Sequence, residues 1–96
     1  MKLIHKYSID PQPFSGQPFR MAMPHGAEIL DVQIQGVRTG QKYIPVIWAL
    51  VDPDKALTSR EFVAYWTGSA VTKDSKYIGT WQLEGLVWHL FDMGER

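Results

Sequence analysis

The chain has no cysteine, no net charge and no long hydrophobic run. The absence of cysteine excludes disulfide bonds, thiolate catalysis and zinc sites built on thiolates, and it suits a reducing cytoplasm. Ten basic and ten acidic residues give a formal net charge of zero. No long-range field therefore draws the chain to long nucleic acid or to an anionic membrane. No window approaches 18 apolar residues, and residues 1–7 lack the pattern of a signal peptide, so we expect no membrane contact.

The length and composition predict one domain that spans residues 1–96. A chain of 96 residues has room for a single core and little more. Its hydrophobic share of 45% and aromatic share of 12% are enough to offset the entropy of ordering the chain. We therefore expect the chain to fold, either alone or as an oligomer.

The strongest local pattern is a pair of aromatic runs that flank Glu84-Gly85 between residues 76 and 92. A two-residue loop at this point pairs Trp81 with Trp88, Thr80 with His89, and Ile78 with Phe91. The core face of this hairpin then carries Tyr77, Trp81, Leu83, Leu86, Trp88 and Leu90. Glutamate suits a turn position with positive φ less well than Asn or Asp, so a bulge could shift this register.

Five further strands are expected from alternating or continuous apolar runs bounded by Pro, Gly and Asp. Their ranges are Leu3–Ile9, Gln17–Met23, Glu28–Gln35, Tyr43–Val51 and Arg60–Thr67. Within the third run, Leu30, Val32 and Ile34 share one face, and residues 55–59 are expected to form a polar turn or a single helical turn. No segment of helix length has helical periodicity. The fold class is therefore all-β, an antiparallel sandwich or small barrel of about seven strands.

No motif marks catalysis or metal binding. The three histidines, His5, His25 and His89, lack the spacing of a metal site, and no local signature marks a nucleophile. Asp52 and Asp54 flank Pro53, and carboxylates in such a turn more often satisfy backbone donors than carry out chemistry. We expect no enzymatic activity, no metal and no cofactor.

Aromatic and basic residues lie close together at several expected strand ends. Bases stack on aromatic rings and phosphates pair with arginine, so these residues could form a nucleotide pocket. The candidate ligand-binding residues are Arg20, Arg38, Arg60, Tyr65 and Trp66. The competing interpretation is that the aromatic residues are core and that the cations keep the strand edges soluble.

Several stretches of the chain resemble a known group of proteins. They are Lys6-Tyr7, residues 24–33, residues 48–52, residues 65–68, Tyr77-Ile-Gly-Thr80, and Val87-Trp-His-Leu-Phe91. In their order and spacing the chain is similar to a family of small tailed-phage and prophage proteins, although residues 14–20 and 36–43 depart from the usual pattern. The resemblance implies a compact β fold and a phage-linked origin, and it supplies no catalytic residues. We expect the protein to act in the cytoplasm of the host cell.

Two functional hypotheses follow. The first is a non-enzymatic accessory protein that evades host defence by capturing a small nucleotide signal or a partner. The second is a structural or protein-interaction module, virion-associated or inhibiting a host protein, with no small ligand. Apolar residues on both faces of the runs 43–51 and 86–91 also predict a homo-oligomer, most simply a two-fold dimer. Its interface could recruit arginines from more than one chain.

The far-ultraviolet circular dichroism spectrum is expected to be dominated by β structure, because no helix-length amphipathic segment exists. A helical content above about a fifth of the residues would contradict the sandwich or barrel assignment.

Overall fold

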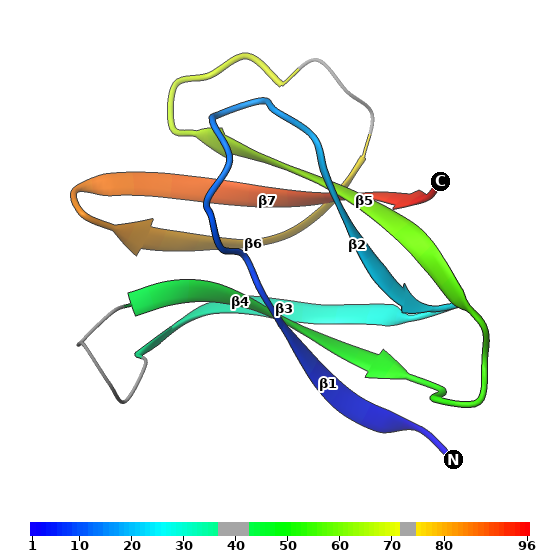
Figure 1. Ribbon diagram of the computed structural model, residues 1–96. Coiled ribbons are helices and arrows are strands. Elements are labelled where there is room, and N and C mark those ends of the chain that lie inside the picture. Colours follow the sequence, from blue (N-terminus) through cyan, green and yellow to red (C-terminus); the bar gives the residue numbers. More distant parts are fainter. Residues whose placement is uncertain (37–42, 72–74) are drawn as a thin grey trace.

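The computed structural model describes residues 1–36, 43–71 and 75–96, and within them the chain forms seven strands and no helix (Figure 1). The strands are β1 (Leu3–Ser8), β2 (Phe19–Pro24), β3 (Glu28–Gly36), β4 (Tyr43–Val51), β5 (Leu57–Trp66), β6 (Lys76–Leu83) and β7 (Leu86–Glu95). The described part of the chain therefore offers no helix that is long and apolar enough to cross a membrane.

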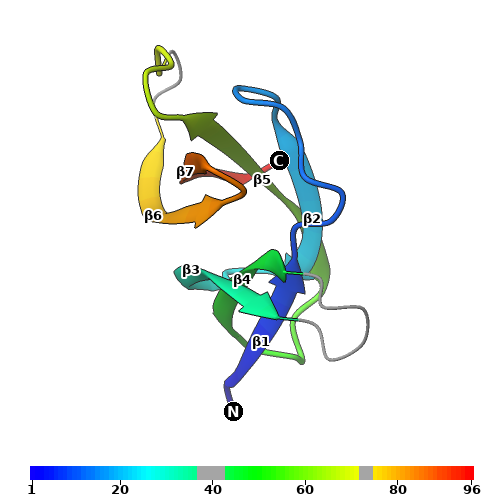
Figure 2. The same cartoon turned by 90° about the vertical axis from the view of Figure 1, so that its left-hand side faces the viewer.

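The strands form two antiparallel sheets, one above the other in Figure 1. The order is β1-β4-β3 in the three-stranded sheet and β2-β5-β7-β6 in the four-stranded sheet. The chain passes between the sheets three times, after β1, after β2 and after β4, and the end-on view in Figure 2 shows the two layers. This architecture confirms the all-β prediction and is sandwich-like rather than a closed barrel.

The core lies between the two sheets and is built mainly from alternate residues of β4, β5, β6 and β7. From the three-stranded sheet it takes the inward side chains of β4, which is the central strand, as its continuous apolar run predicts. The buried cluster comprises Ile9, Met23, Ala27, Ile29, Val32, Ile47, Ala49, Val51, Phe62, Ala64, Trp81, Trp88 and Leu90. Both predicted hairpin tryptophans belong to it, with stacked rings 5.9 Å apart.

The β6–β7 hairpin has the predicted turn and most of the predicted register. Trp81 lies opposite Trp88, and Thr80 lies opposite His89. The predicted pairing of Ile78 with Phe91 is wrong, because the register shifts between Tyr77 and Gly79. The shift places Tyr77 opposite Phe91 and leaves Tyr77 52% exposed, so Tyr77 is not a core residue. Leu86, beside the turn, is 45% exposed, so its assignment to the core is also wrong.

Two other predictions of the residue pattern are wrong. In β3 the register shifts between Ile29 and Asp31, so Ile29 is buried and Leu30 is exposed instead of sharing the core face with Val32. At the start of β5, residues 57–59 pair with β2 and extend the strand, where a polar turn was expected. Both differences come from pairing with a neighbouring strand, which overrides local alternation.

The two sheets approach each other closely where β6 passes β3. A Cβ atom on Gly79 would lie 2.9 Å from Cγ1 of Val32. Glycine fits this approach, because any larger residue would press its Cβ atom against the side chain of Val32, which is a buried core residue.

An ion pair lies at the end of the sandwich opposite the β6–β7 turn. The guanidinium of Arg60 on β5 donates two hydrogen bonds to the carboxylate of Asp92 on β7, at 3.0 and 2.6 Å. It donates a third to the carbonyl of Ala27, at 2.8 Å, in the connection that leads into the other sheet. Burial raises the pKa of Asp92, but the bonds from Arg60 and from the amide of Gly94 more than offset this, so the pKa lies below its ordinary value.

Replacing either buried tryptophan should cost a large share of the stability. Trp81→Ala and Trp88→Ala are each expected to lower the free energy of unfolding by about 3 to 5 kcal/mol in urea titrations, because each leaves a cavity between the sheets. Trp66→Ala is the matched control, with its ring 39% exposed, and should cost about 1 kcal/mol. A loss below about 1 kcal/mol for Trp81 or Trp88 would place that ring outside the core.

Removing the Asp92 charge should make the free energy of unfolding depend less on pH in the acidic range. A carboxyl group with a lowered pKa in the folded state stabilises the fold above its ordinary pKa, and this contribution is lost as the pH falls through the folded value. Asp92→Asn is expected to cost about 3 kcal/mol at pH 7, because it breaks a buried ion pair. The deficit should shrink below pH 3.8, the ordinary value.

Asp54→Asn, at an exposed turn, is the control for this comparison and should match the wild type at every pH. An Asp92→Asn deficit that stays constant between pH 7 and pH 3 would contradict the role assigned to the Arg60–Asp92 pair.

Candidate functional site

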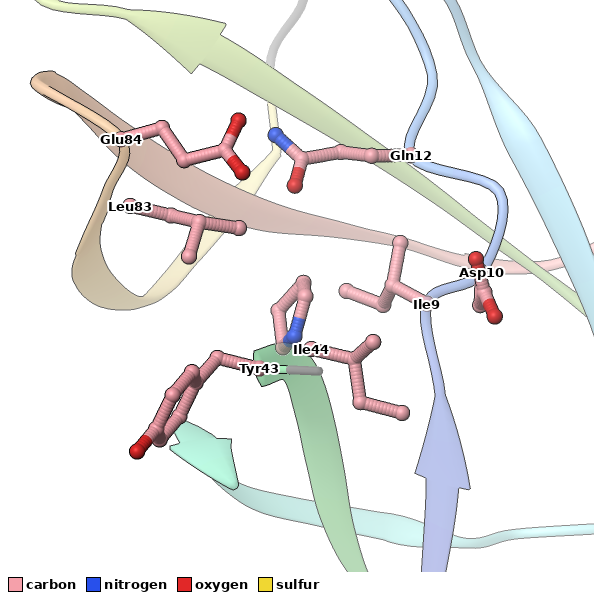
Figure 3. Close-up of a pocket in the computed structure, with 8 residues that line it drawn as sticks. Ile9, Asp10, Gln12, Tyr43, Ile44, Leu83 and Glu84 are labelled. Atoms are coloured by element: carbon pink, nitrogen blue, oxygen red, sulfur yellow. The ribbon is translucent and has the colours of Figure 1, made fainter. Parts of the chain in front are cut away.

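A cleft of about 530 Å³ opens between the two sheets at the end that holds the β6–β7 turn (Figure 3). Its volume lies within the range of small-molecule and side-chain binding sites. The described residues that line it are Ile9, Asp10, Gln12, Tyr43, Ile44, Pro45, Leu83 and Glu84. They come from three parts of the chain: the connection after β1, the start of β4, and the β6–β7 turn.

The floor of the cleft is apolar and anchored to the core. The amide of Ile9 donates a 2.9 Å hydrogen bond to the carbonyl of Pro45, which ties the β1 exit to the start of β4. Ile9 and Pro45 are buried, and Figure 3 shows the side chain of Leu83 reaching from β6 toward Ile9. The floor is therefore preformed, since the same residues also close one end of the core.

The rim carries the polar groups. Figure 3 shows the carboxylate of Glu84 and the amide of Gln12 extending toward each other across the cleft from opposite walls. Tyr43 is 60% exposed, and in the same view its ring lies at the outer edge with the hydroxyl directed away from the cleft. Asp10 is exposed and adds a second carboxylate to the lining.

Glu84 occupies a backbone conformation that glutamate rarely adopts. Its φ is +52°, and Gly85 follows with a φ of +80°. These angles suit the tight hairpin turn, but Asn or Gly meets the left-handed conformation at lower cost. No hydrogen bond or ion pair joins the Glu84 carboxylate to any other residue that the structure describes. The turn therefore carries a strained residue whose side chain faces the cleft rather than stabilising the loop.

The described lining combines two carboxylates, one amide and one phenol above an apolar floor, and it contains no arginine, lysine or histidine. Carboxylates accept hydrogen bonds from ammonium and guanidinium groups and repel phosphate. This arrangement suits a ligand with an apolar stem and a cationic head.

The structure separates the arginines that the sequence proposes as ligand-binding residues. Arg20 on β2 lies 59% exposed, with its Nε 3.1 Å from the carboxylate of Glu61. The hydrogen bond from Arg20 lowers the pKa of Glu61. Arg60 is engaged by Asp92 and by the Ala27 carbonyl. Arg38 lies outside the described residues. Both candidate arginines that the structure describes, Arg20 and Arg60, therefore already have anionic partners on the four-stranded sheet.

The two aromatic candidates lie at the other end of β5. Arg60 and Trp66 are six residues apart on one strand, which corresponds to roughly 20 Å. Trp66 is half-exposed, with its ring edge-on to Trp88 at 5.5 Å. Tyr65 is 4% exposed and packs against Phe91 at 5.8 Å, and its buried hydroxyl has no hydrogen-bond partner among the described residues. The described candidates do not converge on one pocket.

A second polar cluster surrounds His89 on the outer face of the four-stranded sheet. The two ring nitrogens of His89 lie 2.8 Å from the hydroxyl of Thr67 and 2.9 Å from that of Thr80, and Thr80 also bonds the hydroxyl of Tyr77. No carboxylate among the described residues bonds this imidazole. The cluster orders the sheet surface, but it lacks the anion that holds and stabilises a catalytic histidine.

Sequence reasoning missed the residues of the cleft. Asp10 and Gln12 lie in the proline-containing segment after the first expected strand and were assigned no role, and Glu84 was interpreted only as an unfavourable turn residue. The sequence offered one indication of the cleft, the poor fit of glutamate to the turn position of Glu84. A residue that fits its turn poorly often serves another purpose. The convergence of three distant segments has no local signature.

Comparison with curated proteins and with solved structures finds no match. Comparison with protein families matches all of residues 1–96 to one family, described as Domain of unknown function (DUF7352). On this evidence, the chain belongs to the DUF7352 family.

Proposed function

We propose that this protein is a non-enzymatic accessory binding protein that captures a partner protein by holding one of its cationic side chains in the acidic cleft. The observation that carries the proposal is the lining of the cleft, in which the carboxylate of Glu84 faces the amide of Gln12 above an apolar floor and Asp10 adds a second carboxylate to the lining. A lysine or arginine side chain has the matching chemistry: an apolar stem and a charged head.

The conformation of Glu84 supports this proposal. A glutamate with positive φ costs stability, and the Glu84 carboxylate gains no partner within the described chain in return. A bound cation would supply that partner. Because the floor is already packed, binding would require little ordering of the protein, which keeps the entropic cost of association low.

The setting of this function rests on the resemblance of the sequence to small phage proteins. That resemblance supports a partner in the cytoplasm of an infected host cell, such as a protein of the host defence. A protein that only has to block a host factor needs binding rather than turnover, in keeping with the absence of a recognisable catalytic motif.

Capture of a nucleotide signal is the second candidate. The half-exposed ring of Trp66 favours it, since such a ring can stack on a base. Phosphate recognition would need cations, and the described arginines Arg20 and Arg60 are both paired with carboxylates. The distribution of charge therefore favours a cationic ligand over a phosphate.

Binding of simple cationic probes tests the proposal directly. Acetyl-lysine amide and acetyl-arginine amide, titrated into the ¹⁵N-labelled protein, are expected to shift the amide resonances of the non-proline residues that line the cleft, namely Ile9, Asp10, Gln12, Tyr43, Ile44, Leu83 and Glu84. Acetyl-norleucine amide, which has a similar stem without the charge, should not. Glu84→Gln should weaken probe binding by about tenfold or more, because it removes a charge-assisted hydrogen bond.

Glu84→Asn and Asp54→Asn separate loss of the site from loss of the fold. Glu84→Asn should lose probe binding while raising the free energy of unfolding by up to about 1 kcal/mol, since Asn tolerates positive φ better. Asp54→Asn removes a carboxylate from a distant turn and should bind as the wild type does. Shifts caused by linear or cyclic nucleotides, but not by the cations, would replace the proposal with nucleotide capture. No shift with either class would refute both.

A further inference from the structure

Two apolar side chains lie uncovered at the end of the four-stranded sheet that holds the β6–β7 turn. On β7, Leu86 follows the alternation of the core residues Trp88 and Leu90 past the end of the core. On β5, Trp66 lies opposite Trp88, with its ring edge-on to that of Trp88 at 5.5 Å. Leu86 is 45% exposed and Trp66 is 39% exposed. We call Leu86 and Trp66 the apolar ledge.

The apolar ledge continues directly from the lining of the cleft. Leu83, which lines the cleft, lies opposite Leu86 in the β6–β7 hairpin. Side chains directly opposite in an antiparallel pair have Cβ atoms about 5 Å apart, and diagonal neighbours such as Leu86 and Trp66 are about 7 to 8 Å apart. In Figure 1 the end of β6, the start of β7 and the end of β5 lie together at the left of the four-stranded sheet. Leu86 therefore joins the cleft to Trp66.

The segment after β1 makes a second connection between the cleft and the ledge. Gln12 of this segment lines the cleft, and three residues later the hydroxyl of Ser15 accepts a 2.9 Å hydrogen bond from the amide of Trp66. The same hydroxyl lies 3.0 Å from that of Ser69, whose amide donates a 3.1 Å hydrogen bond to the carbonyl of Trp66. The backbone at Trp66 is thus held in place before any ligand binds.

The cleft and the ledge differ in chemistry, so one ligand that fills both needs two kinds of group. The described lining of the cleft has the carboxylates of Asp10 and Glu84 and no cation, whereas the ledge is apolar. In an extended peptide the side chains of residues i and i+2 point to the same side and are about 7 Å apart. This spacing lies between the step from Leu83 to Leu86, about 5 Å, and the distance from β6 to β5, two strand spacings or about 10 Å.

We propose that the partner segment is extended and carries a large apolar residue two positions from its lysine or arginine, an inference that rests on the proposed function. The cationic side chain enters the cleft, and the apolar side chain covers Leu86 and Trp66. An aromatic residue suits the ledge best, because its ring can pack against the partly exposed ring of Trp66. Lysine and arginine are common on protein surfaces, so the second contact is what selects one segment among many basic ones.

Three peptides test the ledge separately from the cleft. They are acetyl-Lys-Gly-Phe amide, acetyl-Lys-Gly-Ala amide and acetyl-Ala-Gly-Phe amide, each titrated into the ¹⁵N-labelled protein. Acetyl-Lys-Gly-Phe amide is expected to bind about tenfold more tightly than each of the other two, because only it fills both surfaces. It should also shift the amide resonances of Leu86 and Trp66, which acetyl-Lys-Gly-Ala amide should leave in place.

Variants of the ledge should reduce the preference for phenylalanine over alanine. Trp66→Ala and Leu86→Ala are each expected to lower the affinity ratio of the two lysine peptides by about threefold or more. Leu57→Ala is the matched control, because Leu57 is 69% exposed at the other end of β5, and it should keep the ratio. Glu84→Gln should weaken both lysine peptides in parallel. If Trp66→Ala fails to fold, Leu86→Ala decides the question alone.

The outcomes separate failure of the ledge from failure of the cleft. Equal affinities of the two lysine peptides would overturn the role of the ledge and leave the cleft proposal standing. A ratio that survives both ledge variants, or that is lost with Leu57→Ala, would overturn the same role. Equal affinities of acetyl-Ala-Gly-Phe amide and acetyl-Lys-Gly-Phe amide would overturn cation capture and this inference with it, and so would the absence of binding by all three peptides.

Discussion

The ion pair between Arg60 and Asp92 joins the two sheets at one end of the sandwich, and the other contacts at that end are arranged around it. Arg60 joins two strands of one sheet through Asp92, and it reaches the chain entering the other sheet through the carbonyl of Ala27. A guanidinium with 14% of its side chain exposed has few water partners, so its donors need these acceptors. The pair therefore specifies how the two sheets meet at this end.

Glu95 extends this group of polar contacts toward the surface. Its carboxylate accepts hydrogen bonds from the hydroxyl of Thr58 and the amide of Gly26, and it lies 3.1 Å from a ring nitrogen of His25. The bond from Thr58 lowers the pKa of Glu95. The C-terminal end of β7 is thus tied to the turn between β2 and β3. The opposite end of the sandwich has no described equivalent, and the cleft opens there.

The cleft proposed for binding depends on the packing of distant segments rather than on regular strand pairing. The cleft is an opening between the sheets, with a rim from loops and a turn, and its chemistry depends on Glu84 and the residues that face it.

The sequence by itself determined the fold class, the turn at Glu84-Gly85, the central position of β4 and the burial of Trp81 and Trp88. These features depend on alternation, turn preference and apolar content, which neighbouring residues encode locally. Only the tertiary structure decided that Tyr77 and Leu30 are exposed, because strand pairing placed the bulges. It also decided that Arg60 has a buried carboxylate as its partner, while Glu84 faces Gln12 across a cleft. Such contacts join residues far apart in the sequence, and no local pattern specifies which distant side chains the packing of two sheets brings together.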